Sequence, residues 1–429
     1  MKHTDIIQKL NLEQKCALLS GETVFTTRAL PGKGIPAITL SDGPNGVRKQ
    51  AGAADHLGLN PSVPATCFPT SSATACSWDE KLGEAVGEAL GEEAAAQEVA
   101  VLLGPGLNIQ RSPLCGRDFE YFSEDPILAG RMAAAYVRGI QKNGISACPK
   151  HFAVNSQELR RMASDSVLDE RTLRELYLTG FEIVVKEAKP KTIMTSYNLI
   201  NGTYANENAH LLQDILRKDW GFDGAVVTDW GGSNDHALGV KNGSTLEMPC
   251  PGGDSIRELM KAVQDGKISE ADVDARLDEM LELVLSTHAA VEKAPRTFDA
   301  AAHHKLARRA AAESIVLLKN EGGILPLKPN EKLAVIGDFA ETPRYQGAGS
   351  SAVNALQVDT LLDSIKADDS GITFVGYASG FERQGAADAE KLEEAVALAK
   401  KADTVLLCLG LDELRESEGL DRSDMKLAE

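Results

Sequence analysis

The chain has 429 residues, of which 43% are hydrophobic and 25% are charged. This is the balance of an ordinary globular protein with room for two or more domains. Its formal net charge is −18, which argues against nucleic acid or an anionic membrane as a partner because an acidic surface repels both.

The N-terminus carries no apolar segment of a secretory signal, and no apolar run approaches the ~20 residues of a membrane span. The seven cysteines are scattered, odd in number and without CxxC spacing. Free thiols of this kind are typical of a reducing compartment, so we expect a cytoplasmic protein.

Residues 1–290 alternate apolar, strand-like segments with amphipathic, helix-like ones. This alternation predicts a parallel sheet covered by helices, and the length suits a (β/α)8-type barrel. The predicted helices lie at 78–98, 171–188 and 207–220, and the predicted strands at 37–41, 99–103, 145–149, 192–196 and 225–227.

The pattern changes over residues 291–311, which we interpret as a linker with His303 and His304 on its surface. Residues 312–429 then predict a partial α/β sandwich domain. The segment at 314–327 opens it, strands follow at 333–337, 372–376 and 404–409, and a helix lies at 388–401. Three strands are fewer than the five or six usual in a doubly wound sheet, so we expect this domain to be incomplete.

Four of the barrel segments deliver polar side chains where the strand ends: Asp42 after 37–41, Lys150 and His151 after 145–149, Tyr197 after 192–196, and Asp229 after 225–227. Side chains at the carboxyl ends of parallel barrel strands line one site. Trp230 follows Asp229 and can stack on a sugar ring. A carboxylate in this setting indicates a nucleophile or a general base.

Several ordered motifs resemble those of glycoside hydrolase family 3, and most of all its β-glucosidase branch. They are SDGP at 41–44, LCGRDFE at 114–120, SEDP at 123–126, KHFAVN at 150–155 with Glu158 and Arg161, MTSYN at 194–198, TDW at 228–230, GD at 337–338 and GAGSS at 347–351. The resemblance spans almost the whole chain. It implies hydrolysis of β-glycosides with retention through a covalent glycosyl-enzyme.

The resemblance assigns Asp229 as the nucleophile. It implies a sugar subsite in which Asp42 accepts from the hydroxyls at C4 and C6, and Trp230 lies near the leaving group. The other implied subsite residues are Arg117, Lys150, His151, Arg161 and Tyr197. Charged groups suit this task because they form the stronger hydrogen bonds to hydroxyls.

Each of these residues also has a plainer interpretation. Arg117 could pair with Asp118, and Arg161 with Asp165, on the surface. Lys150 and His151 could be a solvated lysine beside a core histidine, and the two aromatic side chains, Tyr197 and Trp230, could simply pack.

Retention needs a second carboxyl group, which acts as general acid and then as general base. In the family it comes from a loop of the second domain. Glu418, which precedes Gly-Leu-Asp-Arg at 419–422, matches the family position best, with Glu416 and Glu413 as rivals.

We therefore expect a retaining exo-β-glucosidase that acts on small β-glucosides or short oligosaccharides without cofactor or metal. A β-xylosidase, another β-glycosidase on the same scaffold, and a catalytically silent sugar-binding fragment are the alternatives. We also expect the Glu418 loop to be unsupported and the chain alone to be weakly active or inactive. Its terminal segment is then either mobile or paired with another chain, and a second chain that completes the second domain, or a homo-oligomer, is the expected partner.

Overall fold

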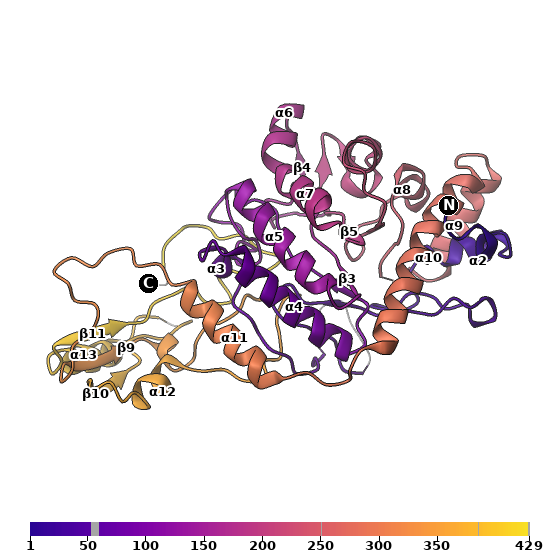
Figure 1. Cartoon of the computed structure of the whole chain (residues 1–429). Coiled ribbons are helices and arrows are strands. Elements are labelled where there is room, and N and C mark those ends of the chain that lie inside the picture. Colours follow the sequence, from indigo (N-terminus) through magenta and orange to yellow (C-terminus); the bar gives the residue numbers. More distant parts are fainter. Residues whose placement is uncertain (53–59, 250, 385, 428–429) are drawn as a thin grey trace.

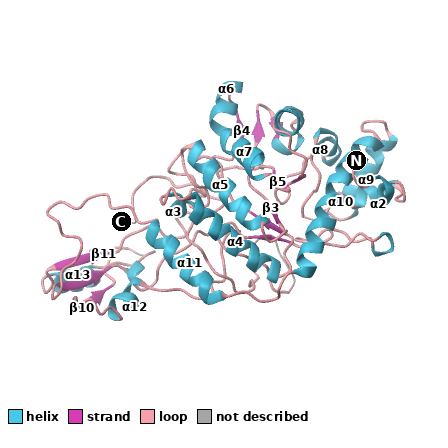
Figure 2. Cartoon of the chain, in the orientation of Figure 1, coloured by secondary structure: helices cyan, strands magenta, loops and turns pink. Residues whose placement is uncertain are grey.

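The computed structural model describes residues 1–52, 60–249, 251–384 and 386–427. Its larger, N-terminal part is a (β/α)8-type barrel and its smaller, C-terminal part is a sheet with helices (Figure 1). Helix α11 (Ala300–Glu313) lies between the two in the chain and in space. Helices dominate the barrel part, and the strands of the second part gather at the opposite end of the molecule from the N-terminus (Figure 2).

The barrel contains the five predicted strands. β1 (Leu40–Asp42), β2 (Val101–Leu103) and β3 (Ser146–Ala147) form one parallel sheet, and β5 (Thr192–Met194) pairs in parallel with β8 (Ala225–Val227). Single parallel bridges continue the ring: Phe152 with Thr195, Val227 with Leu246, and Ser20 with Glu247. The strands are short and buried, as expected for apolar segments covered on both faces.

The helices α4 (Glu80–Ala96) and α5 (Pro126–Gln141) cover this side of the barrel and pack closely against each other. A Cβ at Gly87 would lie 2.4 Å from the backbone oxygen of Tyr136, so the close approach requires glycine. The side chains of Asp79 and Asp125 cap the two helices by accepting from their first backbone N–H groups.

The helix predicted at 171–188 is interrupted. It consists of α6 (Glu170–Thr172), a π-helical turn η2 (Leu173–Tyr177), α7 (Thr179–Ile183) and a second π-helical turn η3 (Val184–Ala188). The Thr179 hydroxyl lies 3.0 and 2.8 Å from the backbone oxygens of Arg174 and Glu175. Such back-bonding by a threonine disturbs the regular backbone ladder.

The remaining barrel elements connect and cover these strands. They are α1 (Thr4–Ile7), α2 (Leu12–Ala17), η1 (Pro31–Lys33), α3 (Ser71–Ala75), β4 (Asp165–Ser166), β6 (Leu199–Ile200), β7 (Thr203–Tyr204), η4 (Ala205–Glu207), η5 (His210–Asp219), α8 (His236–Asn242), α9 (Gly253–Gln264) and α10 (Glu270–Lys293).

The second domain contains the three predicted strands in one parallel sheet. β9 (Lys332–Ile336) is central, between β10 (Thr373–Ala378) and β11 (Thr404–Leu407). The accompanying helices are η6 (Asp338–Ala340), α12 (Leu361–Lys366) and α13 (Ala389–Ala399). The apolar residues at 315–318 are exposed and belong to no strand.

His303 anchors α11 to the barrel, and the expectation that it lies on the surface is wrong. Its side chain is buried, its Nδ1 lies 2.7 Å from an oxygen of Glu93, and its Nε2 lies 3.2 Å from one of Glu92. The ring also stacks on Phe298 at 5.5 Å. Burial alone would lower the pKa of His303, but the hydrogen bonds and charges of the two glutamates raise it above the usual value.

This pairing predicts a pH dependence of stability. The pKa of His303 is higher in the folded than in the unfolded protein. Its contribution to the free energy of unfolding is therefore complete below the unfolded pKa of about 6.5, and it is lost as pH rises through the folded pKa. His303→Gln should therefore lower the urea midpoint more at pH 6 than at pH 9. His304→Gln, at a partly exposed pair with Asp359, is the control. If His303→Gln lowered the urea midpoint equally at pH 6 and pH 9, the predicted pH dependence would be wrong.

Among the described helices, none combines the length and the apolar character needed to cross a bilayer. The six cysteines that the structure describes are free thiols.

Candidate active site

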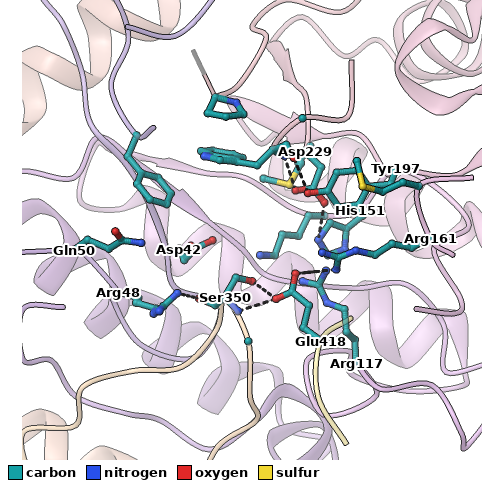
Figure 3. Close-up of a pocket in the computed structure, with 18 residues that line it drawn as sticks. Asp42, Arg48, Gln50, Arg117, His151, Arg161, Tyr197, Asp229, Ser350 and Glu418 are labelled. Atoms are coloured by element: carbon teal, nitrogen blue, oxygen red, sulfur yellow. Dashed lines mark hydrogen bonds and ion pairs between the residues drawn. The ribbon is translucent and has the colours of Figure 1, made fainter. Parts of the chain in front are cut away.

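A cavity of about 460 Å³ lies at the carboxyl ends of the barrel strands, and the second domain contributes part of its wall. All nine side chains singled out in the sequence line it: Asp42, Arg117, Lys150, His151, Arg161, Tyr197, Asp229, Trp230 and Glu418. Asp229 and Glu418 face it from opposite sides, with Asp42 on one flank and Arg161 on the other (Figure 3).

Asp229 follows β8 and is buried, with 9% of its surface exposed. Its Oδ1 accepts a hydrogen bond from the backbone N–H of Trp230 at 2.8 Å. Its Oδ2 has no hydrogen-bond partner and lies 3.6 Å from Nε2 of His151. Burial raises the pKa of Asp229, and the positive charges of Arg117, Arg161 and Lys150 oppose that rise. The unpaired oxygen is therefore available to a reacting atom in the cavity.

His151 is fixed at both its backbone and its ring. Asn108 exchanges hydrogen bonds with the backbone of His151 at 2.8 and 3.0 Å, and the Tyr121 hydroxyl lies 3.0 Å from Nδ1. Burial, reinforced by neighbouring positive charges, holds the pKa of His151 well below the usual value. The ring is thus a neutral hydrogen-bonding group.

Lys150 and Arg117 share one buried counter-ion, Glu120. The Lys150 ammonium lies 3.2 Å from one Glu120 oxygen, and Nε of Arg117 donates to the other at 2.6 Å. The surface pairing of Arg117 with Asp118 is therefore not the one in the structure. Both cations lie in the wall of the cavity, where their N–H groups can donate to a ligand.

Arg161 likewise turns inward and does not pair with Asp165. It donates to Glu158 and to Glu418, each at 2.8 Å, and its guanidinium lies 4.8 Å from the centre of the Tyr197 ring. The Tyr197 hydroxyl donates to the backbone oxygen of Trp230 at 2.9 Å. This last hydrogen bond joins the segments that follow β5 and β8.

Asp42 and Trp230 occupy other parts of the wall. Burial raises the pKa of Asp42 to about 6, against the opposing charge of Lys150. Its carboxyl is therefore an ionised acceptor only above that pH. The Trp230 indole donates to the backbone oxygen of Val24 at 2.7 Å and lies against Phe25, with ring centres 5.3 Å apart.

Glu418 reaches the cavity from the second domain. One oxygen contacts Arg161 at 2.8 Å and Arg117 at 3.4 Å, and the other accepts from the Ser350 backbone and hydroxyl at 2.7 and 2.5 Å. Burial alone would raise the pKa of Glu418, but these two arginines and Ser350 hold it well below the usual range. These contacts favour the ionised form of Glu418.

The two rival glutamates lie elsewhere. Glu416 pairs with Arg344 at 2.9 Å and lines a different cavity. Glu413 is half exposed and lies 3.9 Å from Arg383.

Sequence reasoning did not assign several lining residues a role: Phe25, Arg48, Gln50, Met162, Met194, Gly231, Pro249, Gly349 and Ser350. Gly349 and Ser350 belong to the GAGSS segment, whose role in supporting Glu418 depends on the fold. A Cβ at Gly349 would lie 2.4 Å from that of Glu418, so glycine is required there. Among the described residues, no group of three or more acidic, histidine or cysteine side chains is arranged to hold a metal ion.

Comparison with known sequences identifies the family of the chain. Residues 53–283 match the sequence model of the "Glycosyl hydrolase family 3 N terminal domain" and residues 315–429 that of the "Glycosyl hydrolase family 3 C-terminal domain". The chain belongs to glycosyl hydrolase family 3.

Two relatives within this family are almost equally similar to the chain. It is 45% identical over 427 residues to thermostable beta-glucosidase B of Acetivibrio thermocellus, covering 99% of the chain and 56% of the relative. It is 44% identical over 432 residues to an exo-alpha-(1->6)-L-arabinopyranosidase of Bifidobacterium longum, covering 98% and 56%.

Solved family 3 structures share the fold. The beta-glucosidase of Bifidobacterium adolescentis superimposes with a TM-score of 0.91 at 42% identity, over 98% of this chain and 60% of that one. Beta-glucosidase 3B of Thermotoga neapolitana, solved with α-D-glucose, gives 0.87 at 33% identity, over 99% and 64%. The chain thus spans little more than half the length of the two relatives in sequence, and 60% and 64% of the two solved chains.

Proposed function

We propose that this family 3 chain belongs to a retaining exo-β-glucosidase. The observation that carries the proposal is the unpaired Oδ2 of Asp229, which faces a polar cavity across from Glu418. A nucleophilic carboxylate and a second carboxyl group on opposite sides of one sugar-sized cavity are what double displacement requires.

In the first step, Oδ2 of Asp229 attacks the anomeric carbon while Glu418 gives a proton to the departing glycosidic oxygen. In the second step, Glu418 takes a proton from water, whose oxygen attacks the same carbon and releases Asp229. Glu418 must be protonated for the first step, yet the arginines keep it ionised in the free enzyme. Sugar hydroxyls that bind Arg117 and Arg161 would weaken those contacts and let the pKa of Glu418 rise.

The proposed subsite consists of charged and polar groups around the ring. Arg117, Lys150, His151 and Arg161 would donate to hydroxyls, Asp42 would accept from them, and Tyr197 and Trp230 would pack against the sugar. A missing hydroxyl would leave one of these buried groups unpaired, which lowers both affinity and rate.

A second candidate is favoured by one observation. The exo-alpha-(1->6)-L-arabinopyranosidase is only one percentage point less identical to this chain than thermostable beta-glucosidase B. Arabinopyranose, like xylose, lacks the hydroxymethyl group of glucose. A β-xylosidase, or another glycosidase on this scaffold, is therefore the alternative substrate class.

The test is hydrolysis of p-nitrophenyl β-glucoside, β-xyloside and α-L-arabinopyranoside side by side, with the product followed by NMR. We expect the glucoside to have the highest kcat/KM and β-glucose to appear before its α anomer. An α anomer formed first would refute retention, and a preference for either pentoside would refute the glucosidase. Binding of glucose without any turnover would indicate a silent sugar-binding chain.

We further propose that the chain acts in the cytoplasm, because the six cysteines that the structure describes are free thiols. We also propose a second chain or a homo-oligomer as the partner of the second domain. The expectation of an unsupported Glu418 loop is wrong, because backbone and side-chain groups of this loop form hydrogen bonds with the barrel.

A further inference from the structure

Glu418 stands on a tight turn that lies directly on the barrel. The turn covers residues 417–420, and the backbone N–H of Leu420 donates to the oxygen of Ser417 at 3.4 Å. Gly419, third in the turn, has a φ of +90°, as a type II turn requires. A Cβ at Gly116 of the barrel would lie 1.8 Å from the oxygen of Leu420. The turn and the barrel are therefore in backbone contact.

Asp421, directly after the turn, receives backbone N–H groups from two separate segments of the barrel. Gly116 donates to Oδ1 at 3.1 Å, Glu158 donates to Oδ1 at 2.9 Å, and Leu159 donates to Oδ2 at 2.9 Å. Hydrogen bonds to an ionised acceptor are stronger than neutral ones. One carboxylate thus binds the second domain to both segments.

A return contact completes this attachment. The carboxylate of Glu158 accepts from the backbone N–H of Gly419 at 2.8 Å, and the N–H of Arg422 donates to the oxygen of Leu114 at 2.8 Å. The residue after Glu418 and the residue after Asp421 are therefore both bonded to the barrel.

We propose that Asp421 is the positioning residue for Glu418: its carboxylate latches the turn to the barrel and so sets the place of the acid/base group over the sugar. This rests on the proposed function. Asp421 is not among the residues that line the catalytic cavity, so it acts through Glu418. A catalytic group displaced by about 1 Å can lose ~100-fold in rate.

The side-chain contacts of Glu418 change during the reaction. A bound sugar would compete for Arg117 and Arg161, which contact one oxygen of Glu418, and would leave only the contacts of the other oxygen with Ser350. The backbone N–H groups of Gly116, Glu158 and Leu159 already donate to Asp421, so they are not donors for a sugar hydroxyl. The latch therefore persists when the arginine contacts give way.

The test compares Asp421→Ala, Asp421→Asn and the control Asp424→Ala in the full chain. Asp424 lies in the same loop, is exposed, and accepts from Lys426 at 2.8 Å. The substrates are cellobiose, whose leaving group must be protonated, and 2,4-dinitrophenyl β-glucoside, whose leaving group need not be. Inhibition by glucose reports the sugar subsite, and hydrogen exchange of residues 411–422 reports the loop.

We expect Asp421→Ala to lower kcat/KM for cellobiose by about 100-fold, with a much smaller effect on the dinitrophenyl glucoside and on glucose inhibition. Asp421→Asn, which keeps one accepting oxygen, should lie between. Exchange in the loop should rise in Asp421→Ala and stay unchanged in Asp424→Ala. Equal losses on both substrates, or no loss on cellobiose, would overturn the proposal.

If the unaltered chain hydrolyses neither substrate, the proposed function fails, and the latch is then judged by exchange alone. Unchanged exchange in Asp421→Ala would overturn the latch on its own.

Discussion

Asp229→Asn is expected to lower kcat on the order of 10⁵-fold, because removal of a catalytic nucleophile leaves only binding and electrostatic stabilisation. The amide keeps the shape of the side chain and can still accept from the backbone N–H of Trp230, so glucose should inhibit with a similar constant. The unpaired Oδ2, which would attack the sugar, is the atom that this substitution replaces.

A 2-deoxy-2-fluoro-β-glucoside with a good leaving group should label Asp229, and mass spectrometry of peptides would locate the label. Asp223→Asn is the matched control, since that carboxylate precedes the same strand but is exposed and lies 3.9 Å from Lys2. Labelling of another carboxylate, together with activity in Asp229→Ala, would show that the nucleophile is assigned wrongly.

The barrel half of the site was predictable because strand ends carry positional information. Asp42, His151, Tyr197 and Asp229 each follow a short apolar segment, and parallel strands bring their carboxyl ends to one edge. A run of apolar residues followed by a polar one is visible without any knowledge of packing.

The other half depends on approach between segments far apart in the chain. Ser350 binds Glu418 across 68 positions, and Asp421 binds Gly116 across 305. Neither contact leaves a periodic signal. The GAGSS segment is one of the motifs that resemble the family, but its place beside Glu418 is not visible in the sequence, and its glycine at 349 is explained by the close approach of the Glu418 side chain.

Two predictions made from local sequence differ from the structure. The even amphipathic pattern at 171–188 predicts one helix, while the hydroxyl of Thr179 contributes to the interrupted backbone. The alanine- and arginine-rich sequence around His303 predicts a surface position, but its ring is buried and forms hydrogen bonds with Glu92 and Glu93 of α4. Side chains that find a partner in another element cannot be placed from their own neighbours in sequence.

Glu418→Ala should separate substrates by their leaving groups. The proton from Glu418 is needed when an alkoxide departs and matters little when an acidic phenol departs. We expect kcat/KM for cellobiose to fall about 10³-fold, within the usual range for general acid catalysis. For 2,4-dinitrophenyl β-glucoside it should fall far less, while kcat falls because water is no longer activated in the second step.

Azide distinguishes the loss of the acid/base group from a nonspecific disruption of the active site. It needs no base, so it should attack the glycosyl-enzyme in Glu418→Ala, restore kcat on the dinitrophenyl glucoside and yield glucosyl azide. Glu416→Ala is the matched control, two residues away but paired with Arg344 beside another cavity. It should keep the normal dependence on leaving group and show no response to azide. If Glu416→Ala instead gives the azide response and Glu418→Ala does not, the acid/base is Glu416, and the contacts of Glu418 with Arg161 and Ser350 are structural.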